Sequence, residues 1–408
     1  MPRRPNRFPA WALTAALLAW GVTPARWAPG WTVRVVEGLR ADRRNAGDLE
    51  RMERGYYEGL ADAGRRLDRV GVGRGIDPPP TDFGPLTVAV PDVREYALKP
   101  NVATRHRGAA WTTNARGMRD RDYPASKPGG TFRIALAGDS IGAGWGVDDG
   151  SGFEPAWERT LDGRSRGEGG PAVEVLNHAV PGHAPGQRWE HFRREGWAAG
   201  PDLVVFQGTP ADLGWDDRKL RSLLPRGVGW DAPTYREMLA LAGVAPGAGE
   251  DSCKDRFRPH RPAILASVYR AVVADCRARG VPSVWLLLPR VGKPVPPEDR
   301  DRLAGLAREA GFDAVVDLSD AFDGLDPATL AIAPDDFHPN AQGHALLARR
   351  LDAALQGRLS GPLVLRERAG VWGTATEAPA TLSGRAATLA PAPLPGNEGG
   401  RKLMLRRY

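Results

Sequence analysis

The sequence is poor in residues that would indicate a metal centre or a disulfide framework. Only Cys253 and Cys276 are cysteines in 408 residues, and no Cys/His cluster has a zinc-binding spacing. The chain also lacks a P-loop, and no G-x-G-x-x-G fingerprint with an acidic partner follows a strand pattern. We therefore expect no metal and no organic cofactor.

The two cysteines leave two interpretations open. In an oxidising compartment, Cys253 and Cys276 could pair and tie the loop after Gly249 to a predicted helix at 261–280. Otherwise they are two unrelated buried thiols.

Net charge gives little sign of a nucleic-acid partner. The formal charge is +7, but arginines alternate with acidic residues along most of the chain, and much of the excess lies at the two ends. This pattern is typical of solvated faces and differs from a basic stripe interleaved with aromatic residues.

The first 25 residues resemble a targeting segment. Three arginines precede an uncharged apolar stretch at 8–22, which has 15 residues and is shorter than the ~20 that a spanning helix needs. This predicts a signal peptide or a short signal anchor at 1–25, and thus an exported, extracytoplasmic protein that is secreted or held at the membrane by this segment.

A short apolar run ends in a turn that can present a nucleophile. Residues 134–137 have the composition of a buried parallel strand, and Gly-Asp-Ser follows at 138–140 among further glycines. Ser140 would therefore lie at the carboxyl end of a strand, where open α/β sheets build their sites.

A serine needs a base to act as a nucleophile, and the C-terminal part of the chain supplies one. Residues 334–344 read Pro-Asp-Asp-Phe-His-Pro-Asn-Ala-Gln-Gly-His. Asp335 and His338 have the spacing D-x-x-H, which lets the carboxylate reach Nδ1 of the imidazole while Nε2 faces the serine. Asn340 is placed to cap a helix that follows.

These segments resemble the SGNH (GDSL-type) hydrolases over residues 95–357. The resemblance implies that Ser140 is the nucleophile, His338 the base and Asp335 its orienting acid. The segment Val-Leu-Asn-His-Ala-Val-Pro-Gly at 175–182 is similar to the family's second block, which makes Gly182 an oxyanion donor together with the backbone of Ser140.

One block departs from the family's pattern. Where the family has G-x-N-D, this chain has Gly208 and Asp212, with Ala211 at the position of the oxyanion-binding asparagine. Three explanations stay open: Thr209 or Gln207 donates instead, the hole uses backbone N–H groups alone, or the enzyme is slow or specialised.

The rest of the chain alternates strand and helix patterns, which predicts a three-layer α/β/α fold, SGNH- or flavodoxin-like, with a mostly parallel sheet. The expected strands are 132–137, 173–177, 202–207, 283–288 and 314–317. The expected helices are 152–162, 185–199, 262–280, 298–310 and 341–356. Residues 214–260 read as a long loop that forms a lid or a binding wall.

The predicted organisation is a targeting segment at 1–25, a helical stem and linker at 26–94, a hydrolase domain at 95–358 and a disordered tail at 359–408. Within the stem, 39–70 has a helical pattern, and 96–123 reads as an irregular hairpin that enters the first sheet strand.

The resulting functional hypothesis is an exported serine esterase that hydrolyses a carboxylic ester. The resemblance implies O-acetyl groups on a carbohydrate as the substrate, and lipid esters stay open. One alternative is an O-acetyltransferase that acts on exopolysaccharide. The other, suggested by Ala211, is a cell-envelope glycan-binding protein that has lost catalysis. The expected partner is a small-molecule or glycan ester, with membrane association limited to the N-terminal segment.

Overall fold

The computed structural model describes residues 84–365, except 225–231, 246–247, 249, 335, 357–358 and 361–363. The predicted targeting segment, the helical pattern at 39–70 and the tail beyond 365 lie outside these residues. All described residues belong to the first of the two units into which the chain divides, 1–369. No helix among the described residues is both long enough and apolar enough to cross a membrane.

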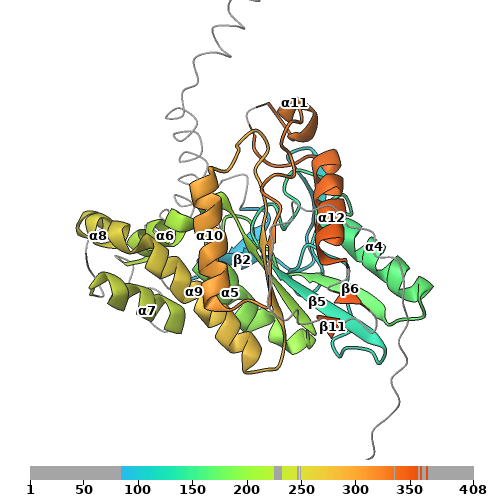
Figure 1. Ribbon diagram of the computed structural model, residues 1–408, viewed down its shortest axis with the longest axis horizontal. Coiled ribbons are helices and arrows are strands. Elements are labelled where there is room, and N and C mark those ends of the chain that lie inside the picture. The colour runs from blue at the N-terminus through green and yellow to red at the C-terminus, as the bar shows by residue number, and fades with distance from the viewer. Residues whose placement is uncertain are drawn as a thin grey trace, which may run out of the picture. The chain divides into compact units, whose positions relative to one another are not determined.

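A five-stranded parallel sheet forms the centre of this unit (Figure 1). Its strands follow the spatial order β6-β5-β7-β8-β9. They are β5 (Thr131–Ala137), β6 (Ala172–Asn177), β7 (Leu203–Gly208), β8 (Ser283–Leu287) and β9 (Ala314–Asp317). Numbered along the chain, this is the order 2-1-3-4-5 of flavodoxin-like sheets, which confirms the predicted fold class.

Alternation along the strands separates two apolar cores. In β5, Ile134 and Leu136 face one core while Ala135 and Ala137 face the other, as the two-residue period of a strand requires. Since both faces are covered, most residues of these strands are apolar on either face.

One core lies under α4 (Phe153–Gly167) and α12 (Ala341–Leu355), which pack against each other on the same side of the sheet (Figure 1). As predicted, Asn340 caps α12, and its side chain accepts hydrogen bonds from the backbone N–H groups of Gln342 and Gly343. The helix therefore begins at Ala341, three residues after His338.

The other core lies under α5 (Pro185–Glu195), α9 (Arg261–Arg277) and α10 (Pro297–Ala310). Shorter elements complete the described chain. They are the 3-10 helices η2 (Trp197–Ala199), η3 (Pro210–Gly214) and η5 (Arg258–His260), the helix α11 (Pro327–Leu330) and the strands β10 (Leu359–Ser360) and β11 (Val364–Leu365).

The prediction of a long loop at 214–260 is wrong. Three helices lie within it, α6 (Trp215–Leu223), α7 (Pro233–Ala242) and α8 (Glu250–Phe257). In α7 the buried side chains include Tyr235, Met238, Leu239 and Ala242, which recur at the helical spacing of three and four residues. This apolar stripe joins the core under α5 and α9, so these residues extend the helical layer.

The two cysteines are both free thiols and both buried, which decides between the two interpretations of the sequence. Cys253 and Cys276 are part of the apolar core under α9.

Two hairpins precede β5, of which the pattern at 96–123 predicted one, the second. The first pairs β1 (Thr87–Ala89) with β2 (Tyr96–Leu98), and the second pairs β3 (Ala103–His106) with β4 (Ala109–Thr112). Side chains from both hairpins enter a third apolar cluster, which includes Leu86, Tyr96, Leu98, Trp111, Trp145, Trp215 and Phe337. The hairpins therefore pack against the segments that carry Ser140 and His338.

Candidate active site

Ser140 lies in the turn that follows β5, at the carboxyl end of that strand. The order of the strands in the sheet changes direction at β5, which makes this end of β5 the topological switch point of the sheet. Asp139 stabilises this turn, because its Oδ1 accepts a hydrogen bond from the backbone N–H of Ile141 at 3.0 Å. Gln207 of β7 holds Asp139 with two further bonds. Its Nε2 donates to Asp139 Oδ1 at 2.6 Å, and its Oε1 accepts from the Asp139 N–H at 3.1 Å.

His338 contacts the serine across the carboxyl edge of the sheet. Its Nε2 lies 2.8 Å from Ser140 Oγ, and its Nδ1 lies 2.5 Å from Asp336 Oδ1. Both Ser140 and His338 are only 1 % exposed. A serine, an imidazole and a carboxylate thus form one hydrogen-bonded chain in the order that nucleophilic catalysis requires.

The carboxylate in this chain belongs to Asp336, whereas the sequence analysis assigned the role to Asp335, which lies outside the described residues. Asp336 Oδ1 also accepts the backbone N–H of His338 at 2.9 Å, closing a tight local turn before Pro339. Asp335 and Asp336 are adjacent in the sequence. The local turn between Asp336 and His338 is the signal that favours Asp336 as the orienting carboxylate.

Burial raises the pKa of Asp336, but hydrogen bonds from His338 and the positive charge of Arg107 outweigh this effect, so the pKa lies below its ordinary value. Asp336 is therefore an ionised acceptor near neutral pH, which is the state that holds an imidazole in one orientation.

Two backbone N–H groups are available for an oxyanion. Neither the N–H of Ser140 nor that of Gly182 donates a hydrogen bond to any other described residue. Gly182 has a φ of +79°, a left-handed conformation that glycine adopts without steric cost, and this explains the glycine at the end of the second block.

The side chains proposed as substitutes for the missing asparagine are already engaged. Thr209 donates its hydroxyl to Asp212 Oδ1 at 2.8 Å and its backbone N–H to Asp212 Oδ2 at 3.0 Å, so it has no donor left for a substrate. Gln207 is committed to Asp139 as described above. Ala211 packs against the third apolar cluster.

Arg188 of α5 connects the three loops that carry these groups, and its side chain is 0 % exposed. It makes a two-point contact with Asp212, with both N–O distances at 3.0 Å, and lies 3.3 Å from Asp139 Oδ2. It also donates to the backbone carbonyls of His183 and Gln207 at 3.0 Å each.

These bonds leave Arg188 fully satisfied, as a buried cation must be. Burial alone would lower its pKa, but the carboxylates of Asp212 and Asp139 outweigh burial and raise it. The residues that Arg188 holds are neighbours of Ser140 and Gly182, so one side chain fixes the relative positions of the first, second and third blocks.

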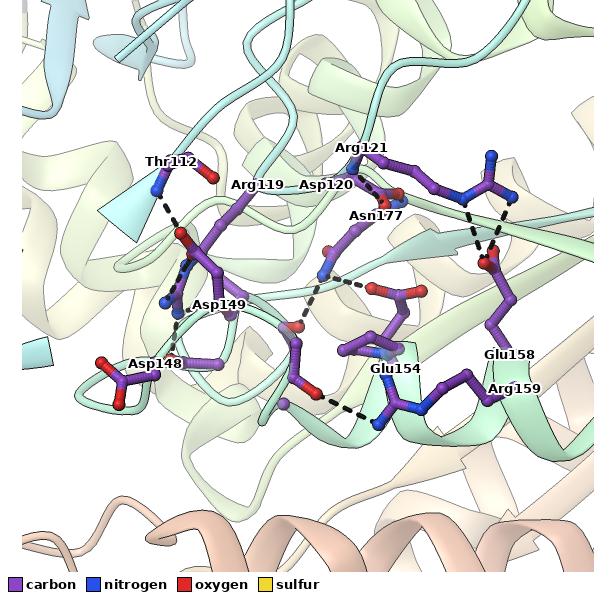
Figure 2. Close-up of a pocket in the computed structure, with 16 residues that line it drawn as sticks. Thr112, Arg119, Asp120, Arg121, Asp148, Asp149, Glu154, Glu158, Arg159 and Asn177 are labelled. Atoms are coloured by element: carbon purple, nitrogen blue, oxygen red, sulfur yellow. Dashed lines mark hydrogen bonds and ion pairs between the residues drawn. The ribbon is translucent and has the colours of Figure 1, made fainter. Parts of the chain in front are cut away.

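A polar cavity of about 560 Å³ lies behind the nucleophile turn (Figure 2). Arg119 enters it from the hairpin region and donates to the backbone carbonyls of Ala143, Gly144 and Val147. The sequence analysis did not assign this role to Arg119. Arg119 is only 8 % exposed, so it is a buried side chain that holds the turn by hydrogen bonds rather than a surface residue.

Asn177, at the end of β6, supports the same turn from the other side (Figure 2). Its Nδ2 donates to the Gly142 carbonyl at 3.0 Å and to Glu154 Oε2 at 3.2 Å. Burial raises the pKa of Glu154 well above its ordinary value, and the charges of Asp120 and Glu158 raise it further. Both effects favour the neutral form of the Glu154 carboxyl.

Replacing Arg188 should strongly destabilise the fold. In Arg188→Met, the carboxylates of Asp212 and Asp139 stay buried without their counter-ion, and the free energy of unfolding should fall by about 3–5 kcal/mol in a urea titration. The matched control is Arg166→Ala, which breaks an exposed pair with Asp162 and should change stability by less than about 0.5 kcal/mol. A similar small loss in both variants would contradict the role of Arg188.

Replacing Glu154 should change how stability depends on pH. A carboxyl with a raised pKa in the folded state contributes stability at low pH that is lost as pH rises through that pKa. Glu154→Gln retains an acceptor for Asn177 but carries no charge. Its urea midpoint should therefore exceed that of the wild type at pH 8 and match it near pH 4. An equal difference at both pH values would show that ionisation is not the cause.

Comparison with known proteins agrees with this geometry. The GDSL-like lipase/acylhydrolase family model matches residues 136–346, just over half of the chain. No curated protein sequence matches the chain.

Among solved structures, three similar ones are a hydrolase named LAE5, TesA and a lipase/acylhydrolase from Enterococcus faecalis. LAE5, from the metagenome of Lake Arreo in Spain, is 19 % identical, with 55 % of this chain and 95 % of that chain covered and a TM-score of 0.37. TesA is 20 % identical, with 56 % and 98 % covered and a TM-score of 0.34. The Enterococcus faecalis protein is 17 % identical, with 58 % and 100 % covered and a TM-score of 0.35.

The family match spans the segment from the nucleophile turn to the helix after His338, and it includes every residue of the hydrogen-bonded chain described above. This chain belongs to the GDSL-like lipase/acylhydrolase family and is a carboxylic ester hydrolase.

Proposed function

We propose that this protein is a serine esterase that cleaves small acyl esters through an acyl-enzyme, with Ser140 as nucleophile, His338 as base and Asp336 as the acid that orients it. The observation that carries the proposal is the unbroken chain of hydrogen bonds from Asp336 Oδ1 through the imidazole to Ser140 Oγ. An intact chain of this kind also argues against the glycan-binding alternative, in which catalysis would have been lost.

The first half of the reaction follows from this geometry. His338 Nε2 takes the proton of Ser140 as Oγ attacks the ester carbonyl, and Asp336 stabilises the imidazolium that forms. The tetrahedral oxyanion is bound by the backbone N–H groups of Ser140 and Gly182, which have no other acceptor among the described residues. The imidazolium then gives its proton to the leaving alcohol.

Water completes the second half by attacking the acyl-enzyme, with His338 again acting as base. Because Ala211 supplies no side-chain donor, the hole has one donor fewer than the family's pattern. Loss of one such donor typically costs about 10²–10³ in turnover, so we expect a slower enzyme than a family member with the asparagine.

Burial of the nucleophile supports a small acyl group. Ser140 and His338 are each 1 % exposed, and the apolar cluster that includes Trp145 and Phe337 lies beside them. Acetyl fits such a site more readily than a long chain. A carbohydrate as the alcohol rests on the family resemblance alone and is tested with acetylated glycans.

Replacing each of the two adjacent aspartates by asparagine tests which of them orients His338. Asp336→Asn should lower kcat on p-nitrophenyl acetate by about 10⁴, because the amide holds the imidazole in the wrong tautomer. Asp335→Asn, the matched control, should retain activity, and Ser140→Ala should abolish it. Full activity in Ser140→Ala would refute the acyl-enzyme, and the reverse result for the two aspartates would reassign the acid.

Acyl-chain length tests the size of the site. We expect kcat/KM for p-nitrophenyl acetate to exceed that for the octanoate by at least about tenfold, since the longer chain meets the packed side chains around Ser140. A preference for octanoate would indicate a lipase-like site instead.

A further inference from the structure

Arg107 reaches the orienting carboxylate from outside the segment that matches the family model. It lies in the two-residue turn between β3 and β4, whereas that match begins at residue 136. Its Nη1 lies 3.1 Å from Asp336 Oδ2, while Oδ1 of the same carboxylate faces His338. The two oxygens of Asp336 are thus divided between the base and Arg107.

The backbone of Arg107 has a left-handed conformation that arginine seldom adopts. Its φ is +49°, and that of the next residue, Gly108, is +82°. Positive φ at both central residues of a two-residue hairpin turn is the type I′ arrangement, for which asparagine, aspartate and glycine are preferred. An arginine there bears a steric cost that its side-chain contacts must offset, and such strain often marks a functional position.

The side chain is anchored at a second point. The guanidinium carbon lies 5.5 Å from the ring centroid of Trp145, and this ring lies 6.2 Å from that of His338. The Arg107 side chain is 35 % exposed and that of Asp336 is 14 % exposed, so the pair lies at the rim of the site.

We propose that Arg107 is a positioning residue for the reaction: it fixes the Asp336 carboxylate against His338. The hairpin β3–β4 thereby becomes part of the active site. This proposal rests on the proposed function, in which His338 is the base.

Other charged or titratable groups also lie near His338. Asp336 lies on the Nδ1 side and Ser140 on the Nε2 side. His344 interacts electrostatically with His338, and Arg290 and Lys293 lie over the ring of Phe337. Arg107 forms an ion pair with Asp336 Oδ2, so its removal acts directly on the carboxylate that holds His338.

The test is Arg107→Asn, which removes the cation and places a preferred residue in the turn. We expect kcat to fall by about tenfold with KM within twofold, because a loosened carboxylate holds the imidazole less well. The melting temperature should not fall.

Two further variants separate charge from geometry. Arg107→Lys keeps the charge and should retain most of the wild-type kcat. Arg105→Ala removes the other arginine of the same hairpin, whose side chain donates, among the described residues, to the Gly108 carbonyl, and should leave kcat unchanged.

Wild-type kcat in Arg107→Asn would overturn the proposal. So would a loss of kcat that comes with a lower melting temperature, because this indicates a purely structural role. Ser140→Ala, assayed alongside, separates failure of the proposed function from failure of this proposal. Hydrolysis by that variant refutes the proposed function, whereas wild-type kcat for Arg107→Asn in an enzyme that Ser140→Ala inactivates refutes only the role of Arg107.

Discussion

The site depends on one buried cation. Arg188 has no solvent exposure and bonds to the residue before Ser140, to the residue after Gly182 and to the aspartate of the third block. These three loops leave different strands at the same edge of the sheet. A buried ion pair is stable only in a narrow range of geometries, so Arg188 fixes the loops relative to one another. Ser140 and the backbone N–H of Gly182 therefore hold their relative positions even though the asparagine of the third block is absent.

The second constraint comes from the hairpins before the sheet. Their side chains pack with Trp145 and Phe337, and Arg119 binds three backbone carbonyls of the nucleophile turn. The turn is thus held from the core side by Arg188 and Gln207 and from the outer side by Arg119. A catalytic segment recognised by its family motifs is completed here by residues that precede it.

Much of this could be predicted from the sequence because local patterns determine it. The apolar runs placed all five sheet strands. The motif order predicted Ser140, Gly182 and His338 as site residues, and the structure brings Ser140 and His338 within hydrogen-bond distance. The prediction of a loop at 214–260 was wrong because the helical spacing of the apolar residues in α7 was missed. Arg107 and Arg188 act through contacts between segments that are distant in the sequence, and no local pattern specifies such contacts. Asp336 was missed because Asp335, its neighbour, is the same residue type.

The central claim is that Ser140 is activated by His338 despite Ala211. The most direct measurement is reaction of the folded protein with a fluorophosphonate probe, followed by peptide mass mapping. We predict a covalent adduct on Ser140 that is absent in His338→Ala, because a serine without its base reacts slowly. No adduct under conditions that fully label a control serine esterase, or an adduct on another residue, would contradict the account.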